Sequence, residues 1–354
     1  MSMKTLSVHA VERRRAARGW SQTELARRAG IPRTTVSAIE GERLTPSVTA
    51  ALALARALEC SVEELFGAGL NEPAGGCPEW AWPVQTGTCR YWEAEVGGRR
   101  LLYPVEGLSQ NTIPHDGIWH EGIGRDTGTP PAEKTLVLAC CDPAAGLLAT
   151  EYARTSGFRL LIIERGGGAA LELLKRGLVH LAGVHRSTPD HPFLNAETAR
   201  MKLGHGYRLI RMAKWQEGLA LPAGDRSSTL EGSVRQCRRW ALREQGSAAR
   251  ECLDELLAGR RATGKPVHSH LAVAEAIRAG WAAAGVCVQL TAQDAGLNFV
   301  PVRTEMLDVC YSEAMAHDGR ILALIRLLRS RSHRRLISEL PGYDASETGE
   351  TLEP

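Results

Sequence analysis

The first seventy residues repeat apolar positions with the period of short amphipathic helices, and several of these helices have a recognisable beginning or end. Ser21 and Glu24 form an S-x-x-E capping box, which satisfies the free N–H groups at the start of a helix. Thr45-Pro46 offers an N-cap followed by a proline in the first helical position. Gly30 suits the left-handed conformation that ends one helix and turns the chain into the next. The pattern predicts a five-helix, all-α domain that contains a helix-turn-helix.

Polar side chains on the third of these helices predict a surface that reads DNA. Val36 and Ile39 lie about one turn apart and mark the buried face. The opposite face then carries Thr34, Ser37 and Ala38, with Arg33 and Thr35 on its flanks. Short polar side chains beside an arginine suit the major groove, whereas the alternative is a small helical bundle with a solvated polar face. Between residues 12 and 43, eight Arg face four Glu, and this local positive charge favours DNA.

This region resembles the XRE (Cro/repressor-like) helix-turn-helix family over about residues 7–66. The resemblance implies that Gln22 and Arg43 contact phosphates of double-stranded DNA. It also implies contacts to base edges from Arg33, Thr34, Thr35 and Ser37. Family members often have Asn-Gly after the third helix, where this chain has "EGER". Because one short helix reads few bases, we expect the protein to bind DNA as a homodimer.

Residues 70–132 lose the helical period and predict a linker followed by a small β-rich segment. The stretch "CRYWEAEVGGRRLLYP" alternates apolar and polar residues around Gly97-Gly98, which predicts a hairpin. Four aromatic residues are expected in a small core or an interdomain contact rather than in a ligand cage: Trp80, Trp82, Tyr91 and Trp92. The stretch "HDGIWHEG" has only two histidines and one aspartate, too few for a convincing metal site, and is expected to be a loop.

After Pro131 apolar strands alternate with helices, as in "KTLVLAC", "FRLLIIE" and "VHLAGVH", which predicts an α/β domain with parallel strands. Ligands of such sheets bind beyond the carboxyl ends of the strands. One strand ends at Cys140 and Cys141, and another runs into three glycines before a helix, which favours an anion. Alternation along a strand sends the two cysteines to opposite sides, so we expect Cys140 to pack in the core and Cys141 to line a pocket. Sensing of a metal or of redox state by the Cys141 thiol stays open.

The same region, about residues 133–345, resembles the periplasmic-binding-protein-like domain of the molybdate-binding type. The motifs include "IIERGGGAALELLKRGLVHLAGVH", "REQGSAARECLDELL", "HSHLAVAEAIRAG" and "GLNFVPVRTEMLDV". The resemblance implies two α/β lobes joined by two crossovers, with lobe one at about 133–210 and 302–340 and lobe two at about 211–301. Residues 346–354 are expected to be a flexible tail.

The resemblance also implies a cleft that binds a small anion, with an oxyanion such as molybdate or tungstate as the first choice. The expected ligand-binding residues of lobe one are Cys141, Asp142, Gly167, Gly168 and His185, and those of lobe two are Gln245, Gly246, Ser247 and Arg250. Structural roles remain open for several of them: the glycines could serve helix packing, His185 could be a satisfied core histidine, and Arg250 could pair with Asp254 at i+4. For His268 and His270, in "HSH", we expect a strand or capping role rather than a metal site.

The composition adds little beyond the domain count. A chain of 354 residues is expected to form more than one domain, and a net charge of +3 does not identify a partner. The N-terminus lacks the pattern of a secretory signal and no apolar run is long enough to span a membrane, so we expect a cytoplasmic protein with reduced cysteines.

The sequence therefore indicates a multidomain, DNA-binding transcription regulator that senses a small ligand, with no catalytic residues, no metal and no cofactor. One alternative is a regulator whose C-terminal domain is a ligand-free scaffold for dimerisation or partner docking. Another is an enzyme fused to a DNA-binding module, with Cys141 as nucleophile and His185 as base.

Overall fold

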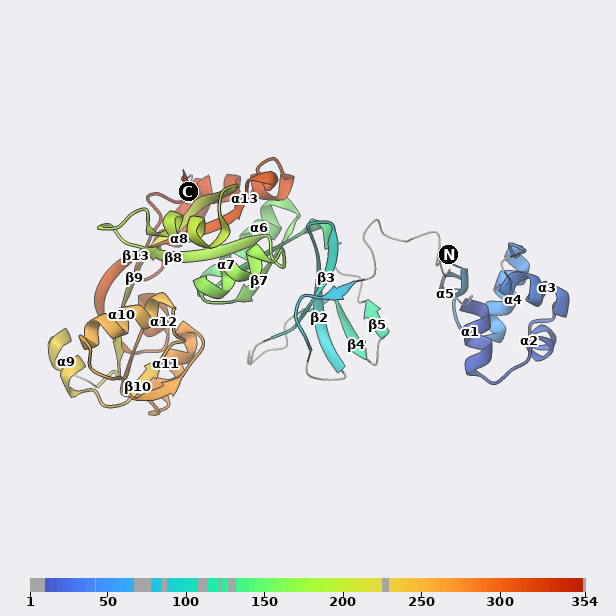
Figure 1. The fold of residues 1–354 in the computed structure, drawn as a ribbon, viewed down its shortest axis with the longest axis horizontal. Helices are drawn as coiled ribbons and strands as arrows, with labels where there is room; N and C mark the ends of the chain where they lie inside the picture. Colours follow the sequence, from blue (N-terminus) through green and yellow to red (C-terminus); the bar gives the residue numbers. More distant parts are fainter. Residues whose placement is uncertain are drawn as a thin grey trace. The chain divides into compact units, whose positions relative to one another are not determined.

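The computed structural model describes residues 10–41, 43–66, 78–84, 88–106, 114–120, 123–126, 132–224 and 229–352. It divides into two compact units, residues 1–76 and 77–354, which are considered separately (Figure 1). None of the helices in these described segments is both long and apolar enough to cross a lipid bilayer.

The first unit contains the five helices that the sequence predicts. They are α1 (Ala10–Ala17), α2 (Gln22–Ala29), α3 (Arg33–Glu40), α4 (Val48–Ala57) and α5 (Val62–Phe66). The Ser21 side chain accepts a hydrogen bond from the Glu24 N–H, and Gly30 ends α2 with a φ of 64°, as expected. The expected cap at Thr45-Pro46 is wrong, because α4 begins later and the Ser47 hydroxyl accepts from the Ala50 N–H. The turn between α2 and α3 is therefore the one that the glycine predicts.

The buried carboxylate of Glu40 connects the three helices α1, α2 and α3 of this unit. Glu40, at the end of α3, is only 8% exposed. Its carboxylate accepts hydrogen bonds from the Arg15 guanidinium at 2.7 and 3.0 Å and from the Gln22 amide at 2.8 Å. Val36 and Ile39 lie in the apolar core beside it, as the helical pattern predicts. The carboxylate thus fixes α3 against α1 and against the start of α2.

The second unit begins with a five-stranded sheet in the order β1-β3-β2-β4-β5. Its strands are β1 (Glu79–Trp80), β2 (Thr88–Val96), β3 (Arg99–Pro104), β4 (Gly117–His120) and β5 (Ile123–Asp126). The predicted hairpin is confirmed, since β2 and β3 pair antiparallel around Gly97 and Gly98, both with positive φ. The expectation of a loop at "HDGIWHEG" is wrong for Gly117–His120, because these residues form β4, which pairs with both β2 and β5; Glu121 and Gly122 lie outside the described residues.

This small sheet shares its core with the α/β domain that follows. Trp92 and Tyr103 lie in one apolar cluster with residues of that domain, in agreement with the packing role expected for the aromatic residues. The Asp116 carboxylate accepts from the Arg159 guanidinium at 2.5 and 2.6 Å and from the Glu93 N–H at 2.7 Å. Buried His180 accepts from a backbone N–H at 3.0 Å and lies 2.8 Å from the Glu95 carbonyl oxygen. The small sheet is therefore anchored by buried polar contacts as well as by apolar packing.

The α/β domain is built on a second sheet, in the order β11-β10-β12-β9-β13-β8-β6-β7. Lobe one contains β6 (Thr135–Cys140), α6 (Ala145–Ser156), β7 (Arg159–Glu164), α7 (Gly167–Lys175), β8 (Leu181–Ser187), α8 (Leu194–Leu203), α13 (Gly319–Arg329) and α14 (Arg331–Ser338). Lobe two contains α9 (Leu230–Gln236), β10 (Trp240–Leu242), α10 (Ala248–Leu257), β11 (Gly264–Pro266), α11 (His270–Arg278), β12 (Ala284–Val288) and α12 (Gln289–Asp294). Short 3-10 turns occupy Ala132–Lys134 and Glu313–Met315. Parallel pairing within each lobe agrees with the predicted alternation of strands and helices.

Two long strands run through both lobes. They are β9 (Tyr207–Leu221) and β13 (Asn298–Ser312), which pair antiparallel along their whole length. The expected lobe boundaries, after residues 210 and 301, fall inside these strands. The expectation of a flexible tail is wrong for residues 346–352, because β15 (Thr351–Leu352), like β14 (Tyr343–Asp344), pairs with β9; residues 353 and 354 lie outside the described residues. The C-terminal segment is thus part of lobe one.

Candidate functional site

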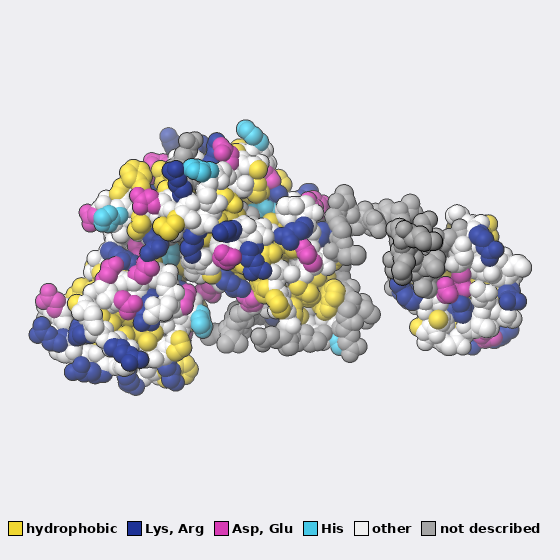
Figure 2. Space-filling view, viewed as in Figure 1, with side chains coloured by type: hydrophobic (Ala, Val, Ile, Leu, Met, Phe, Trp, Pro, Cys, Tyr) yellow, Lys and Arg dark blue, Asp and Glu magenta, His cyan; other side chains and the backbone are white. Residues whose placement is uncertain are grey.

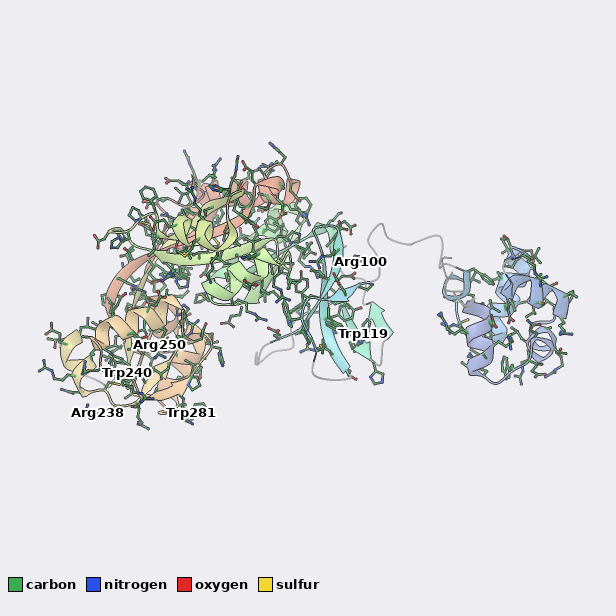
Figure 3. The ribbon with its side chains drawn as sticks, viewed as in Figure 1. Arg100, Trp119, Arg238, Trp240, Arg250 and Trp281 are labelled. Atoms are coloured by element: carbon green, nitrogen blue, oxygen red, sulfur yellow. The ribbon has the colours of Figure 1, made fainter. Side chains whose placement is uncertain are left out.

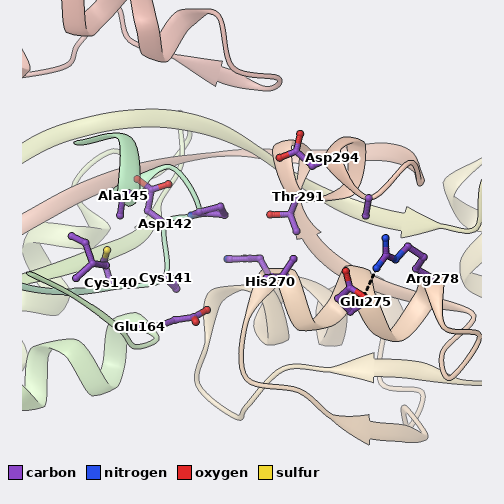
Figure 4. A pocket seen from close by; sticks show the side chains of 15 residues that line it. Cys140, Cys141, Asp142, Ala145, Glu164, His270, Glu275, Arg278, Thr291 and Asp294 are labelled. Atoms are coloured by element: carbon purple, nitrogen blue, oxygen red, sulfur yellow. Dashed lines mark hydrogen bonds and ion pairs between the residues drawn. The ribbon is translucent and has the colours of Figure 1, made fainter. Parts of the chain in front are cut away.

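A cavity of about 490 Å³ lies where the two lobes face each other (Figure 4). Lobe one contributes residues from the end of β6, the start of α6 and β7, and lobe two contributes residues from α11 and α12. The lining comprises Cys140, Cys141, Asp142, Pro143, Ala145, Gly146, Ile162, Glu164, His270, Leu271, Glu275, Arg278, Thr291, Asp294 and Ala295. The cavity therefore lies at the carboxyl ends of parallel strands, where ligands of such sheets bind.

The charged groups of the lining are mostly acidic. They are Asp142, Glu164, Glu275 and Asp294, against the single cation Arg278. Arg278 donates to the Glu275 carboxylate at 2.9 Å, which offsets one of these charges (Figure 4). Burial raises the pKa of Asp142, although the Tyr343 hydroxyl donates to this carboxyl group at 2.6 Å. Such a lining favours a ligand that carries positive charge.

Cys141, which belongs to the lining, starts a buried chain of hydrogen bonds that continues behind it through His185 to Glu305. Cys141 Sγ lies 3.1 Å from His185 Nε2, and His185 Nδ1 lies 2.7 Å from Glu305 Oε2. The three residues are 6%, 3% and 0% exposed, respectively. An Nδ1–H that donates to the carboxylate leaves the Nε2 lone pair directed at the thiol. The arrangement therefore presents a sulfur and an imidazole nitrogen side by side.

His270, the first residue of α11, approaches this pair from lobe two. Its ring points toward Cys141 across the cavity (Figure 4). One ligand atom from each of Cys141, His185 and His270 lies within 4.8 Å of the other two. His270 is 1% exposed, and neither ring nitrogen has a hydrogen-bond partner among the described residues. Burial and then the charge of Arg243 hold the pKa of His270 well below its usual value, so its ring is neutral.

A second buried cluster lies on the two long strands next to His185. Arg303 donates to the Glu217 carboxylate at 3.0 Å and to Glu305 at 2.6 Å. Burial and the neighbouring Glu305 carboxylate raise the pKa of Glu217 well above its usual range. A protonated Glu217 leaves one negative charge, on Glu305, to balance Arg303. The histidine is thus oriented by a carboxylate that is itself held in place.

The sequence-predicted ligand residues do not all meet at this cavity. Cys141 and Asp142 line it, and His185 contacts Cys141 from behind. Gly167 and Gly168 form the first turn of α7 and are not in the lining. Gly166, the residue before these two glycines, lies close to the carboxylate of Glu244 from lobe two. A Cβ atom on Gly166 would be 2.8 Å from Glu244 Oε1. An acidic side chain thus lies near the helix start that the sequence suggested for an anion.

The predicted residues around α10 have structural partners. Gln245 and Gly246 are exposed in the loop before this helix and are not in the cavity lining. The Ser247 side chain caps α10 by accepting from the Arg250 N–H at 3.3 Å. Arg250 pairs with Asp254 at 2.9 Å, the i+4 alternative that the sequence left open (Figure 3). These residues therefore do not line this cavity, and their contribution to ligand binding stays a prediction.

Two expectations about thiols and histidines have different outcomes. Cys140 lies in the apolar core of lobe one while Cys141 meets His185, as alternation along a strand predicts. His270 was expected in a strand or capping role, but the N-cap of α11 is Ser269 and His270 faces the cavity. No sequence spacing links positions 141, 185 and 270. The available signal was that each lies near the carboxyl end of a strand or at the start of a helix.

In the first unit, the structure locates every residue expected to contact DNA. Arg33 and Thr34 are exposed on α3, whereas Thr35 and Ser37 are half-buried. Arg43 is exposed and its guanidinium reaches the Ser37 carbonyl oxygen at 3.4 Å. The Gln22 amide is already bonded to Glu40, which limits its freedom to reach a phosphate. The exposed part of the predicted surface is thus the start of α3, with Arg33 and Thr34, and Arg43, three residues after the end of this helix.

The outer surface of lobe two differs in charge from the cavity. Figure 2 shows Lys and Arg side chains gathered there, around the position that Figure 3 labels Arg238. The exposed cations of this part of the chain are Arg235, Arg238, Arg239, Arg260, Arg261 and Lys265. The outer surface of lobe two therefore carries a cluster of cations, in contrast to the carboxylates that line the cavity.

The fold and the site define a protein with a helix-turn-helix DNA-binding domain and a two-lobed α/β domain of the kind that binds small ligands. The family described as helix-turn-helix matches residues 11–65. The family described as PBP superfamily domain matches residues 149–329, just over half of the chain. The chain therefore belongs to the PBP superfamily and combines that domain with an XRE-type helix-turn-helix.

Individual relatives are more distant. The chain is 30% identical over 184 residues to the uncharacterized protein YvgK of Bacillus subtilis (strain 168), a match covering 49% of this chain and 58% of that protein. An ABC-type phosphate transport receptor from Vibrio cholerae is similar in structure, with a TM-score of 0.43 and 15% identity over 59% of this chain and 99% of that one. The reduced form of OxyR from N. meningitidis has a TM-score of 0.40 and 14% identity, covering 59% and 98%.

Proposed function

We propose that this protein is a one-component transcription regulator that binds operator DNA through α3 and senses a small effector between the lobes of its C-terminal domain. The observation that supports it most is the joining, in one chain, of a helix-turn-helix with a ligand-binding superfamily domain that has a cavity at its strand ends. Closure of the lobes on an effector is the conformational change that would alter DNA binding.

The effector is expected to be small and to carry positive charge. Four carboxylates and one arginine line the cavity, which argues against the oxyanion that the sequence suggested. The nearby α7 start, the other anion site suggested by the sequence, has the Glu244 carboxylate beside it. The two experimental classes to compare are therefore cations, including metal ions, and oxyanions such as molybdate.

We further propose that the regulator acts as a homodimer. Three apolar side chains around the start of α4 are exposed: Leu44 at 46%, Val48 at 77% and Leu52 at 45%. Val48 and Leu52 lie one turn apart on the same face, so together they offer a small apolar surface for a second copy. Sedimentation analysis of Val48→Glu should give monomers where the unchanged protein gives dimers. A dimer that survives this substitution places the contact elsewhere.

The DNA-binding half is tested by operator binding. After selection of the operator from random duplexes, Arg33→Ala combined with Thr34→Ala should weaken binding by at least about 10-fold, because base contacts contribute about 1–3 kcal/mol each. Arg56→Ala is the matched control, because it removes the same positive charge from an exposed arginine on α4, away from α3. Equal operator affinity of the α3 variant and the control would contradict the assignment of α3 as the reading helix.

The sensing half is tested by thermal shift and by operator affinity with each effector class. A compound at about 100 times its Kd should stabilise the C-terminal unit by about 2.7 kcal/mol. The same compound should change operator affinity. A set of cations, oxyanions and metabolites that leaves both quantities unchanged would favour the ligand-free scaffold instead.

A further inference from the structure

The strongest unexplained feature of the molecule is the meeting of Cys141, His185 and His270 between the lobes. Their ligand atoms lie within 4.8 Å of one another, and all three residues are more than nine-tenths buried. Cys141 and His185 belong to lobe one, whereas His270 belongs to lobe two. A thiol and two imidazoles at this spacing form a donor set rather than an apolar contact.

His185 is oriented so that one of its ring nitrogens can bind a further partner. His185 Nδ1 is bonded to Glu305, which also accepts from Trp215 Nε1 at 3.1 Å. A carboxylate that holds one nitrogen of a histidine fixes the ring and leaves the other nitrogen free to bind a metal. That second nitrogen is the one beside Cys141. The geometry therefore matches the support that metal-binding histidines usually have.

The third donor, His270, lacks any partner that the described residues supply. Both of its ring nitrogens are buried and unbonded. Leaving a buried polar atom without a hydrogen-bond partner is energetically costly, so such atoms normally have one. A ligand that bonds to His270 and to the two donors opposite would remove this cost.

We propose that Cys141, His185 and His270 bind one transition-metal ion of the Zn²⁺ class. A thiolate with two imidazoles is a soft-to-borderline donor set, which suits Zn²⁺, Co²⁺ or copper and does not suit Mg²⁺ or Ca²⁺. Tetrahedral ligands around Zn²⁺ are separated by roughly 3.5 Å. Cys141 Sγ and His185 Nε2 are already 3.1 Å apart, so ion binding mainly requires His270, which lies within 4.8 Å of both, to move closer. Three protein ligands leave a fourth position open toward the cavity.

The charges around the site are compatible with a cation. Arg243 is buried nearby and interacts electrostatically with Cys141, but its guanidinium is paired with the Glu244 carboxylate at 3.1 Å. A thiolate ligand offsets one charge of the ion, and the carboxylates of the cavity lie along its route from solvent. The thiol, His185 and Glu305 are also arranged as in a thiol nucleophile with its base, but that chemistry gives no role to His270.

The metal site extends the proposed function by connecting the lobes. An ion bound to lobe one through Cys141 and His185 and to lobe two through His270 fixes the angle between them. The regulatory consequence rests on the proposed function, whereas metal binding itself does not.

The test is metal binding by the full chain. Purified protein, stripped with a chelator, should take up one Zn²⁺ per chain in competition with a chromophoric chelator. With Co²⁺ it should show a thiolate-to-metal charge-transfer band and the d–d absorption of a tetrahedral site. Cys141→Ser should abolish the charge-transfer band, and His270→Gln should weaken Zn²⁺ binding by more than about 10-fold.

Two neighbours provide matched controls. Cys140→Ser changes the adjacent buried cysteine, and His268→Gln changes an exposed histidine two residues from His270. Both should keep the stoichiometry and the cobalt spectrum. Absence of Zn²⁺ and Co²⁺ binding by the unchanged protein, or an unchanged cobalt spectrum in Cys141→Ser, would overturn the site.

A separate experiment measures the affinity of the protein for its operator DNA with and without Zn²⁺. If the ion binds through the three residues but operator affinity does not change, the site stands and its role as the effector fails. If the site fails while another compound changes operator affinity, the proposed sensor stands without the metal.

Discussion

Replacing Asp116 by Asn should uncouple the small β-sheet from lobe one. The Asp116 side chain is 6% exposed and the Arg159 side chain 18% exposed. Two bonds from the guanidinium and one from the Glu93 N–H converge on the carboxylate, with distances of 2.5 to 2.7 Å. An amide removes the negative charge and turns one acceptor into a donor that faces another donor. The buried guanidinium then keeps a charge without a counterion.

The expected cost is about 3 kcal/mol in the free energy of unfolding, because breaking a buried ion pair from one side costs about 3–5 kcal/mol and Arg159 is partly solvated. Seven of the eight tryptophans lie beyond residue 76, so tryptophan fluorescence in urea follows mainly this unit. Glu79→Gln is the control, since its pair with Arg99 has side chains 53% and 45% exposed and should cost less than about 1 kcal/mol. If Asp116→Asn destabilises the unit no more than Glu79→Gln, the ion pair does not anchor the sheet.

Three further outcomes follow from buried groups. Glu40→Gln should destabilise the helix-turn-helix unit by about 2–4 kcal/mol, measured by circular dichroism during thermal unfolding, because half-buried Arg15 loses its counterion. His180, with its pKa lowered to about 4 by burial, is neutral when folded, so stability is full above about pH 6.5 and falls by up to about 3 kcal/mol as the pH drops to 4. Urea titrations of His180→Gln at several pH values should show a weaker fall, and an identical fall would exclude this histidine as a cause. Gly183→Ala should cost about 1–3 kcal/mol in urea unfolding, since its Cβ would lie 2.6 Å from that of Cys140; unchanged stability would mean that the strands adjust freely.

Local chemistry determined how much of the fold could be predicted. The capping box at Ser21 and the glycine at position 30 act on their own neighbours, so the sequence located α2 and its turn correctly. The strand at His120 has a nearby partner in β5, but it joins the sheet through β2, whose paired residues lie about thirty positions earlier. The β15 strand was missed because it adds to β9 from more than a hundred residues away. Short strands without their own alternating pattern depend on such distant partners.

The site was predictable only in part for the same reason. Cys141 and Asp142 were located from one strand end, but His270 reaches Cys141 only because β9 and β13 bring lobe two opposite lobe one. The acidic lining could not be predicted from the sequence either, because its four carboxylates lie in or next to the separate elements α6, β7, α11 and α12. The expectation of an anion came from helix starts considered singly, without the side chains that the opposite lobe presents to them.

The two strands shared by the lobes also determine how the domain flexes. In lobe one, β14 and β15 pair with β9 as far as Trp215. In lobe two, β12 pairs with the same edge of β9 from Glu217 onward. Gln216 lies between these two sets of pairings, beside the irregular pairing of β13 between Pro301 and Arg303, so we expect a change in the angle between the lobes to bend the strands near this residue. We expect the two lobes to move as units about this point, where the Arg303 ion pairs lie. A small rotation there would displace the far ends of the lobes by a larger distance, which is how the proposed effector would produce a large change in the domain.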